Sequence, residues 1–195
     1  FAMPPAPVLI LMTSLNGARW LPGQLASIAA QEHRDWALWV SDDGSTDATR
    51  EIVAGFAAER AGRNPVVLVE GPRGGSAAAN FLHLLCRSEL PLGPRTHVAF
   101  ADQDDLWRPG KLARALEVLA EAGAGSEGVP IVYGGQSLHI DEAGRPRGRS
   151  RRPLRPVTLG NAVVQNMVSG HSMVLNPEAV ALARAAGVPP GVAYH

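Results

Sequence analysis

The 195-residue sequence lacks the features that mark several protein classes. Its single cysteine, Cys86, excludes an internal disulfide, and it has no cysteine cluster of the zinc-binding type. Lysine occurs only at Lys111, and the 18 basic residues balance the 18 acidic ones, so composition offers no argument for a nucleic-acid partner. Apolar runs such as residues 8–12 are far shorter than the roughly 20 residues of a membrane-spanning helix. We recognise no signal peptide and expect a cytoplasmic protein, with peripheral contact at the inner face of a membrane left open.

Short apolar segments alternate with helical patterns through residues 8–122. The apolar runs are expected to form buried strands, because they are too short for helices and are bounded by polar turns. Their alternation with helices predicts an α/β fold, a mostly parallel sheet flanked by helices, with ligands at the carboxyl ends of the strands. The expected strands are residues 8–12, 36–40, 66–69 and 98–101, and the expected helices are residues 20–31, 47–59, 77–87 and 109–122.

Acidic and amide side chains follow three of the four predicted strands. Carboxylates held close together repel one another, and a divalent cation between them relieves that repulsion. Oxygen ligands of this kind suit Mg²⁺ or Mn²⁺. A solvated acidic turn that caps the next helix is the alternative, since Asp105 and Pro109 both suit a helix start. The expected gathering of the acidic and amide side chains at one sheet edge favours a ligand site. These side chains are Asn16, Asp42, Asp43, Asp102, Asp104 and Asp105.

Common phosphate-binding and calcium-binding motifs do not fit. A P-loop is excluded because Lys111 is followed by Leu112 and the upstream glycine of the motif is missing. The first strand is not followed by the glycine-rich fingerprint of dinucleotide-binding proteins. An EF-hand counted from Asp102 would place Leu106 where an oxygen ligand belongs. What remains is a phosphorylated ligand bound to aspartates through a metal ion.

The remainder of the chain, residues 123–195, has a different pattern. Two strands are expected at residues 131–135 and 137–140, followed by a turn at 141–144. Residues 145–155 contain six arginines and are expected to form a mobile loop. This loop either attracts a phosphate-bearing or lipid-linked acceptor or is simply solvated. A short helix at 158–164, a strand at 172–175 and a helix at 177–185 complete the prediction.

Four linked motifs stand in order along the chain: residues 8–17 (VLILMTSLNG), Leu25 with Ile28 and Gln31, residues 40–47 (VSDDGSTD) and residues 102–112 (DQDDLWRPGKL). Together they resemble the family 2 glycosyltransferases of the GT-A fold. A further segment, Gln165-Asn166-x-Val168-x-Gly170-x-x-Met173, resembles the rhamnosyltransferase-like branch, which usually takes a dTDP-sugar. The resemblance implies a Rossmann-like GT-A domain. It also implies an inverting transfer of a sugar, with rhamnose as the candidate, from a dTDP- or UDP-sugar to a glycan or lipid-linked acceptor.

The resemblance also implies roles for individual residues. Asp104 or Asp105 would hold Mg²⁺ or Mn²⁺, and the metal would neutralise the leaving diphosphate. Trp107, directly after the acidic run, and His171, beside Gly170, are candidates for contact with the acceptor, with packing as the alternative for both. The implied donor-binding residues are Thr13, Asn16, Asp42, Asp43, Arg73, Asn80, Asp102 and Asp104.

An inverting transfer needs a base that takes the proton of the acceptor hydroxyl. The resemblance puts this base immediately after His195, where the sequence ends. We therefore expect residues 1–195 to be one GT-A domain with a nucleotide-sugar-binding half at 1–122. Its acceptor-side half, residues 123–195, is expected to be incomplete at the C-terminus. A nucleotide-sugar-binding fragment without turnover and a metal-dependent nucleotidyltransferase are the competing interpretations.

Overall fold

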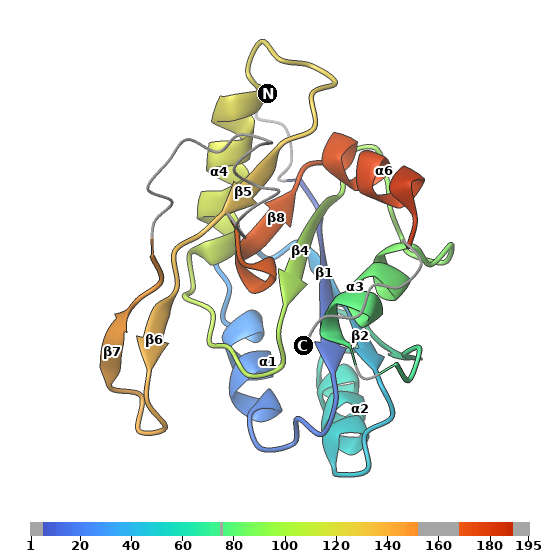
Figure 1. Cartoon of the computed structure of the whole chain (residues 1–195), viewed down its shortest axis with the longest axis vertical. Helices are drawn as coiled ribbons and strands as arrows, with labels where there is room; N and C mark the ends of the chain where they lie inside the picture. Colours follow the sequence, from blue (N-terminus) through green and yellow to red (C-terminus); the bar gives the residue numbers. More distant parts are fainter. Residues whose placement is uncertain (1–5, 75, 152–167, 189–195) are drawn as a thin grey trace.

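The computed structural model describes residues 6–74, 76–151 and 168–188. In these ranges a six-stranded sheet lies between two layers of helices, and a separate two-stranded hairpin projects from one side (Figure 1). The α/β class predicted from the sequence is confirmed. The sheet strands, in spatial order, are β3 (Val66–Glu70), β2 (Trp36–Asp42), β1 (Val8–Ser14), β4 (His97–Ala101), β8 (Met173–Leu175) and β5 (Val132–Gly134).

Strand β1 forms the centre of the sheet. It pairs in parallel with β2 on one side and with β4 on the other, and all seven of its residues are buried. Its side chains alternate between the two helix layers, so Ile10 packs with one core cluster and Leu9 with the other. A strand covered on both faces needs apolar residues at nearly every position, which explains the unbroken run. The helices are α1 (Leu21–Ala29), α2 (Thr49–Glu59) and α4 (Lys111–Gly123) on one face, and α3 (Ala77–Leu85) and α6 (Pro177–Ala186) on the other.

The register brings the ends of the parallel strands to one edge. Ser14 lies opposite Asp42, and Asp42 lies opposite Glu70 on the next strand. Met12 lies opposite Ala101, the last residue of β4. The loops that follow these strands therefore start from the same edge of the sheet, as the strand–helix alternation predicts.

Strand β8 lies between β4 and β5 and runs in the opposite direction to both. It pairs antiparallel with both β4 and β5, and it follows a short 3₁₀ helix, η1 (Gly170–Ser172). Because β8 runs against β4, the residues just before Met173 come back to the carboxyl end of β4. The strands predicted near residues 131–135 and 172–175 are confirmed in shortened form.

The prediction of a loop over residues 145–155 is wrong in part. Strand β7 (Pro146–Arg149) pairs antiparallel with β6 (Leu138–Ile140) and forms the projecting hairpin. The reversal is built at Asp141, whose Oδ1 accepts the N–H groups of Ala143 and Arg145. Residues 152–167, including Arg152, Arg155 and the helix predicted at 158–164, lie outside the described residues.

No helix in the described part of the chain combines the length and the apolar character that crossing a membrane requires.

Candidate functional site

The loop after β1 and the loop after β2 are joined by hydrogen bonds. The N–H of Asn16 donates to Ser45 Oγ at 2.8 Å, and the N–H of Thr46 donates back to Asn16 Oδ1 at 2.9 Å. Asn16 has a φ of 50°, a left-handed conformation that asparagine tolerates better than most residues. The N–H of Gly17 donates to Thr49 Oγ1 at 2.8 Å, which fixes the loop to the start of α2. Asn16, predicted to bind the donor, therefore also shapes the edge of the site.

A single side chain joins the loop after β1 to the acidic loop after β4. Gln103 Oε1 accepts the N–H of Leu15 at 3.0 Å, and its Nε2 donates to the Leu15 carbonyl at 3.2 Å. A Cβ at position 17 would overlap the Gln103 amide, so Gly17 leaves room for this bridge. The sequence gives no local signal for this role of Gln103, because only the folded chain brings it against Leu15.

Asp42 is a fully buried carboxylate at the end of β2. It accepts hydrogen bonds from Ser14 Oγ, from the N–H and hydroxyl of Ser45, and from the Arg50 guanidinium at 3.2 Å. Burial alone would raise the pKa of Asp42, but the hydrogen bonds from Ser45, Arg50 and Ser14 outweigh it and hold the pKa below its usual value. These bonds give the carboxylate a positioning role beneath the loop.

Asp43, the next residue, lies beside the loop that follows β3. Its Oδ1 accepts the N–H of Arg73 at 2.6 Å, while its own N–H donates to the Ser14 carbonyl at 2.8 Å. A Cβ on Gly71 would lie 3.0 Å from the backbone of Asp42 and Asp43, so a glycine permits this close approach. The Arg73 side chain is largely exposed and stands 3.5 Å from Glu70.

Two predicted donor residues are buried next to these loops. Thr13 is 7% exposed on β1, and Asn80 is 2% exposed on α3. Asn80 Oδ1 accepts the Ser41 hydroxyl, and its Nδ2 donates to the Ser41 carbonyl at 3.2 Å. Both ends of the Asn80 amide are thus bonded to β2, so in this conformation Asn80 attaches α3 to the sheet.

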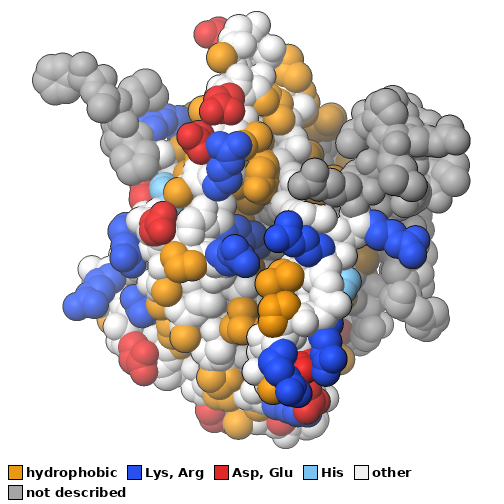
Figure 2. Space-filling model, turned by 90° about the vertical axis from the view of Figure 1, so that its left-hand side faces the viewer, with side chains coloured by type: hydrophobic (Ala, Val, Ile, Leu, Met, Phe, Trp, Pro, Cys, Tyr) orange, Lys and Arg blue, Asp and Glu red, His pale blue; other side chains and the backbone are white. Residues whose placement is uncertain are grey.

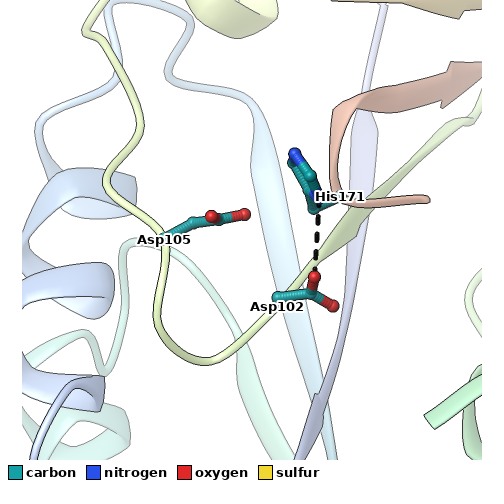
Figure 3. A group of neighbouring side chains, drawn as sticks. All are labelled: Asp102, Asp105 and His171. Atoms are coloured by element: carbon teal, nitrogen blue, oxygen red, sulfur yellow. Dashed lines mark ion pairs between the residues drawn. The ribbon is translucent and has the colours of Figure 1, made fainter. Parts of the chain in front are cut away.

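The acidic loop brings two carboxylates to a histidine from a distant part of the chain (Figure 3). Asp102 follows β4, Asp105 lies in the same loop, and His171 comes from η1. One potential ligand atom from each residue lies within 4.8 Å of the others. His171 Nδ1 is 3.6 Å from Asp102 Oδ2, and its Nε2 is hydrogen-bonded to Ser137 Oγ at 2.7 Å. The hydrogen bond from Ser137 therefore fixes the ring with Nδ1 toward Asp102, and a second hydrogen bond of this kind is usual for a histidine that binds metal.

The chemistry of this group suits a divalent cation. Oδ2 of Asp105 is buried and has no hydrogen-bond partner, which is costly for a carboxylate. Burial raises the pKa of Asp105, and the nearby charge of His171 only partly opposes this. The neighbouring Asp102 carboxylate raises the pKa of His171. A cation held by these three side chains would satisfy the unpartnered oxygen and offset the repulsion between the two carboxylates.

The predicted metal pair, Asp104 and Asp105, is divided by the fold. Asp105 belongs to the group with Asp102 and His171, whereas the side chain of Asp104 is exposed and lies outside it. His171, predicted to lie on the acceptor side, is a member of the group. The sequence could not indicate this grouping, because it depends on the antiparallel register of β8 against β4.

Lys111 connects the acidic loop to η1. Its Nζ donates to the His171 carbonyl at 2.7 Å and lies 3.5 Å from the centre of the Trp107 ring. Burial lowers the pKa of Lys111 to about 7, although Asp105 and Asp102 favour its charged form. Trp107 itself is 6% exposed and packs in the core cluster that contains α4. Gly170 begins η1 beside His171.

A parallel sheet with carboxylates gathered at its carboxyl edge is typical of α/β proteins that bind phosphorylated ligands. The sequence model of glycosyl transferase family 2 matches residues 9–173, and the chain belongs to this family. Among curated relatives, the dTDP-rhamnosyl transferase RfbG of Shigella flexneri is 32% identical over 111 residues, covering 55% of this chain and 36% of RfbG. The UDP-Glc:alpha-D-GlcNAc-diphosphoundecaprenol beta-1,3-glucosyltransferase WfgD of Escherichia coli is 26% identical over 131 residues, covering 67% of this chain and 46% of WfgD. The chain therefore spans less than half the length of either relative.

Solved structures share the fold. TarS of S. aureus, in complex with UDP-GlcNAc, has a TM-score of 0.64 at 19% identity, covering 88% of this chain and 45% of that one. The mannosyltransferase PcManGT from Pyrobaculum calidifontis, in complex with GDP-Man and Mn²⁺, has a TM-score of 0.62 at 24% identity, covering 96% of this chain and 48% of that one. The GT-A fold expected from the sequence motifs is confirmed.

Proposed function

We propose that residues 1–195 form a single GT-A domain that transfers a sugar from a nucleotide-diphosphate donor, with inversion, to a glycan or lipid-linked acceptor. Residues 1–122 are its donor half and residues 123–195 its acceptor-side half. The observation that carries this proposal is the meeting of Asp102, Asp105 and His171 at the sheet edge (Figure 3). The same edge carries the loops that Asn16 and Gln103 join together.

The nucleobase of the donor is assigned to Asp43 and Arg73, which lie in the loops after β2 and β3 at the carboxyl edge of the sheet. Asp43 is 8% exposed and held by the Arg73 N–H, so it offers a fixed acceptor for the N–H of a pyrimidine. The exposed Arg73 guanidinium beside it would attract the diphosphate. RfbG is named for dTDP-rhamnose and WfgD for UDP-glucose, so a dTDP- or UDP-sugar is the proposed donor and rhamnose the candidate sugar.

Asp102, Asp105 and His171 are assigned to a divalent cation, Mn²⁺ or Mg²⁺. An imidazole nitrogen among the ligands favours Mn²⁺, because Mg²⁺ prefers an all-oxygen shell. When bound, the cation would neutralise charge on the leaving diphosphate. The chain's own residues prepare this site: Ser137 orients the His171 ring, and Lys111 holds the His171 carbonyl.

The base for the acceptor hydroxyl is assigned to a residue following His195, in keeping with the resemblance to the rhamnosyltransferase-like branch. His195 and the lead-in at residues 191–195 lie outside the described residues. Extending the chain beyond His195 should therefore raise transfer to an acceptor, while donor binding stays unchanged. Normal transfer rates from the 195-residue chain would contradict this assignment of the base.

WfgD is named for a diphosphoundecaprenol-linked acceptor, which supports a cytoplasmic location at the inner face of a membrane.

Thermal-shift measurements test the donor and metal assignments together. A dTDP- or UDP-sugar at about 100 times its Kd, with Mn²⁺, should raise Tm by roughly 5–10 °C, and a GDP-sugar should raise it less. Asp105→Asn should remove the Mn²⁺-dependent part of this shift. The same variant should raise the Tm of the metal-free protein, because it removes a buried carboxylate whose pKa is raised by burial.

Asp104→Asn is the matched control, because it changes an exposed acid in the same loop. It should keep the Mn²⁺-dependent shift. If Asp104→Asn loses the Mn²⁺-dependent shift and Asp105→Asn keeps it, the metal is bound by Asp104 and not by Asp105. No shift with any nucleotide sugar, with or without Mn²⁺, would overturn the proposed function itself.

A further inference from the structure

The β6–β7 hairpin exposes apolar side chains on one face. It projects from the side of the sheet in Figure 1, and every residue of both strands is exposed. Leu138 lies opposite Arg149 and Ile140 lies opposite Pro146, with a register shift between His139 and Ile140. Residues directly opposite each other share a face, so Leu138 and Arg149 lie together. Leu138 is 39% exposed and Ile140 is 42% exposed. The hairpin therefore exposes two aliphatic side chains, one of them opposite an arginine.

The charges of the hairpin are unbalanced in favour of arginine. Asp141 is paired with Arg145 and Arg147 at 3.1 and 2.9 Å. Arg149 and Arg151 have no acidic partner among the residues that the structure describes. The described part of the hairpin therefore carries two arginines that no described acidic side chain balances, and one of them, Arg149, lies opposite Leu138.

An exposed tryptophan lies near the hairpin turn. Arg19 pairs with Glu142 of the turn at 3.0 Å and stacks on the Trp20 ring at 4.2 Å from its centre. Trp20, which the sequence analysis did not place in a binding surface, is 39% exposed. Figure 2 looks onto this side of the molecule and shows arginine side chains intermixed with hydrophobic ones.

We propose that the hairpin, with Trp20, is a contact surface for an anionic lipid bilayer. Arginines attract the negatively charged headgroups, aliphatic side chains insert between them, and tryptophan favours the membrane interface. A polyanion in solution would use the arginines but would gain little from exposed Leu138 and Ile140, so the apolar face favours a bilayer. The purpose of this contact rests on the proposed function, since a lipid-linked acceptor would be presented at that surface.

The base of the hairpin is connected to the candidate metal group. Ser137, directly before β6, is hydrogen-bonded to His171 Nε2 at 2.7 Å, and its N–H donates to Ser150 Oγ at 2.9 Å. A bilayer bound to the hairpin would therefore lie beside the acceptor side of the site.

Vesicle co-sedimentation of the 195-residue chain tests the proposal. We expect binding to vesicles that contain phosphatidylglycerol and phosphatidylcholine, weak binding to pure phosphatidylcholine, and loss of binding at high salt. The double variant Arg149→Gln/Arg151→Gln should lower the partition coefficient about 25-fold, at about fivefold for each arginine. Leu138→Ser/Ile140→Ser should also lower it, and this second variant distinguishes a bilayer from a soluble polyanion.

Two control variants change similar residues elsewhere. Arg63→Glu alters an exposed arginine between α2 and β3, and Leu182→Ser alters an α6 side chain that is 62% exposed. Both should bind anionic vesicles as the unchanged chain does. Equal binding to neutral and anionic vesicles, or unchanged binding by the double arginine variant, would overturn the proposal. Sensitivity to the arginines without sensitivity to Leu138 and Ile140 would also overturn it and indicate a soluble polyanion. Thermal shifts with a nucleotide sugar, measured on the same variants, report separately on the donor site.

Discussion

Residues 6–122 and the described residues after 123 differ in how far their strands are buried. In residues 6–122 the strands are parallel and buried, and polar side chains such as Gln24, Gln31 and Asp42 are fully buried with their partners supplied. In the described residues after 123, β6 and β7 are wholly exposed. The wholly exposed strands of the second part are therefore confined to the β6–β7 hairpin, because β8, β5 and α6 belong to the sheet and its helix layers. The proposed donor side is packed throughout, whereas the proposed acceptor side adds a hairpin that lies outside the sheet.

The largest loss of stability is expected when a buried side-chain amide is removed from residues 6–122. Gln31 is 0% exposed, donates to the Arg108 carbonyl at 2.8 Å and accepts the Leu112 N–H at 3.2 Å. Gln31→Ala leaves the buried Leu112 N–H without its partner, while the Arg108 carbonyl keeps the Lys111 N–H. The variant should cost roughly 2–3 kcal/mol of the free energy of unfolding. Urea denaturation measures this loss.

Gln136→Ala is the matched change in the second part. Gln136 Nε2 donates to the Ser150 carbonyl at 2.7 Å on an exposed surface. Water replaces such a bond, so the free energy of unfolding should change by less than about 0.5 kcal/mol. Equal losses for the two variants would contradict the contrast between the buried polar contacts of the first part and the exposed hairpin.

Asn176 tests whether the second part depends on a single anchor. Its Oδ1 accepts the N–H groups of Ile131 and Ala179, and its Nδ2 donates to the Val129 carbonyl, so it caps α6 and holds the start of β5. Asn176→Ala should cost about 2 kcal/mol by thermal or urea unfolding. Ser76→Ala, which removes only the bond to the Ala79 N–H at the start of α3, should cost about 1 kcal/mol. The reverse order would mean that α6 is held mainly by its apolar contacts.

Acid titration probes the buried carboxylate of the first part. The native pKa of Asp42 lies below its usual value of 3.8, so its ionised form stabilises the fold above that pH. This stability is lost as the pH falls through the native pKa. Asp42→Asn should therefore cost about 1.5 kcal/mol at pH 7, with a smaller difference from the unchanged chain at pH 3. Urea midpoints at both pH values measure the effect, and the exposed Asp35→Asn should overlay the unchanged chain.

The sequence predicted the first part well, because its signals are local. Residues 8–12 form an unbroken apolar run, which only a strand covered on both faces requires, and the helix between the first two strands shows apolar residues at helical spacing. β7 was missed because Pro146 and Gly148 are poor strand formers and arginines give no apolar alternation. Its pairing comes from the turn at Asp141 and the neighbouring β6, which are both expected from the sequence, although the strand that follows them is not.

The sequence by itself determined the four parallel strands, their alternation with helices along the chain, and the edge to which Asp43, Asp102 and Asp105 belong. Hydrophobic periodicity and the rule that strands end at one edge are sufficient for that. Only the tertiary structure decided that Asp105 joins Asp102 and His171 while Asp104 points to solvent. The physical reason is that this grouping depends on how β8 is aligned against β4, and on the contact of Lys111 with the His171 carbonyl. Alignments between segments so far apart in the chain leave no local pattern.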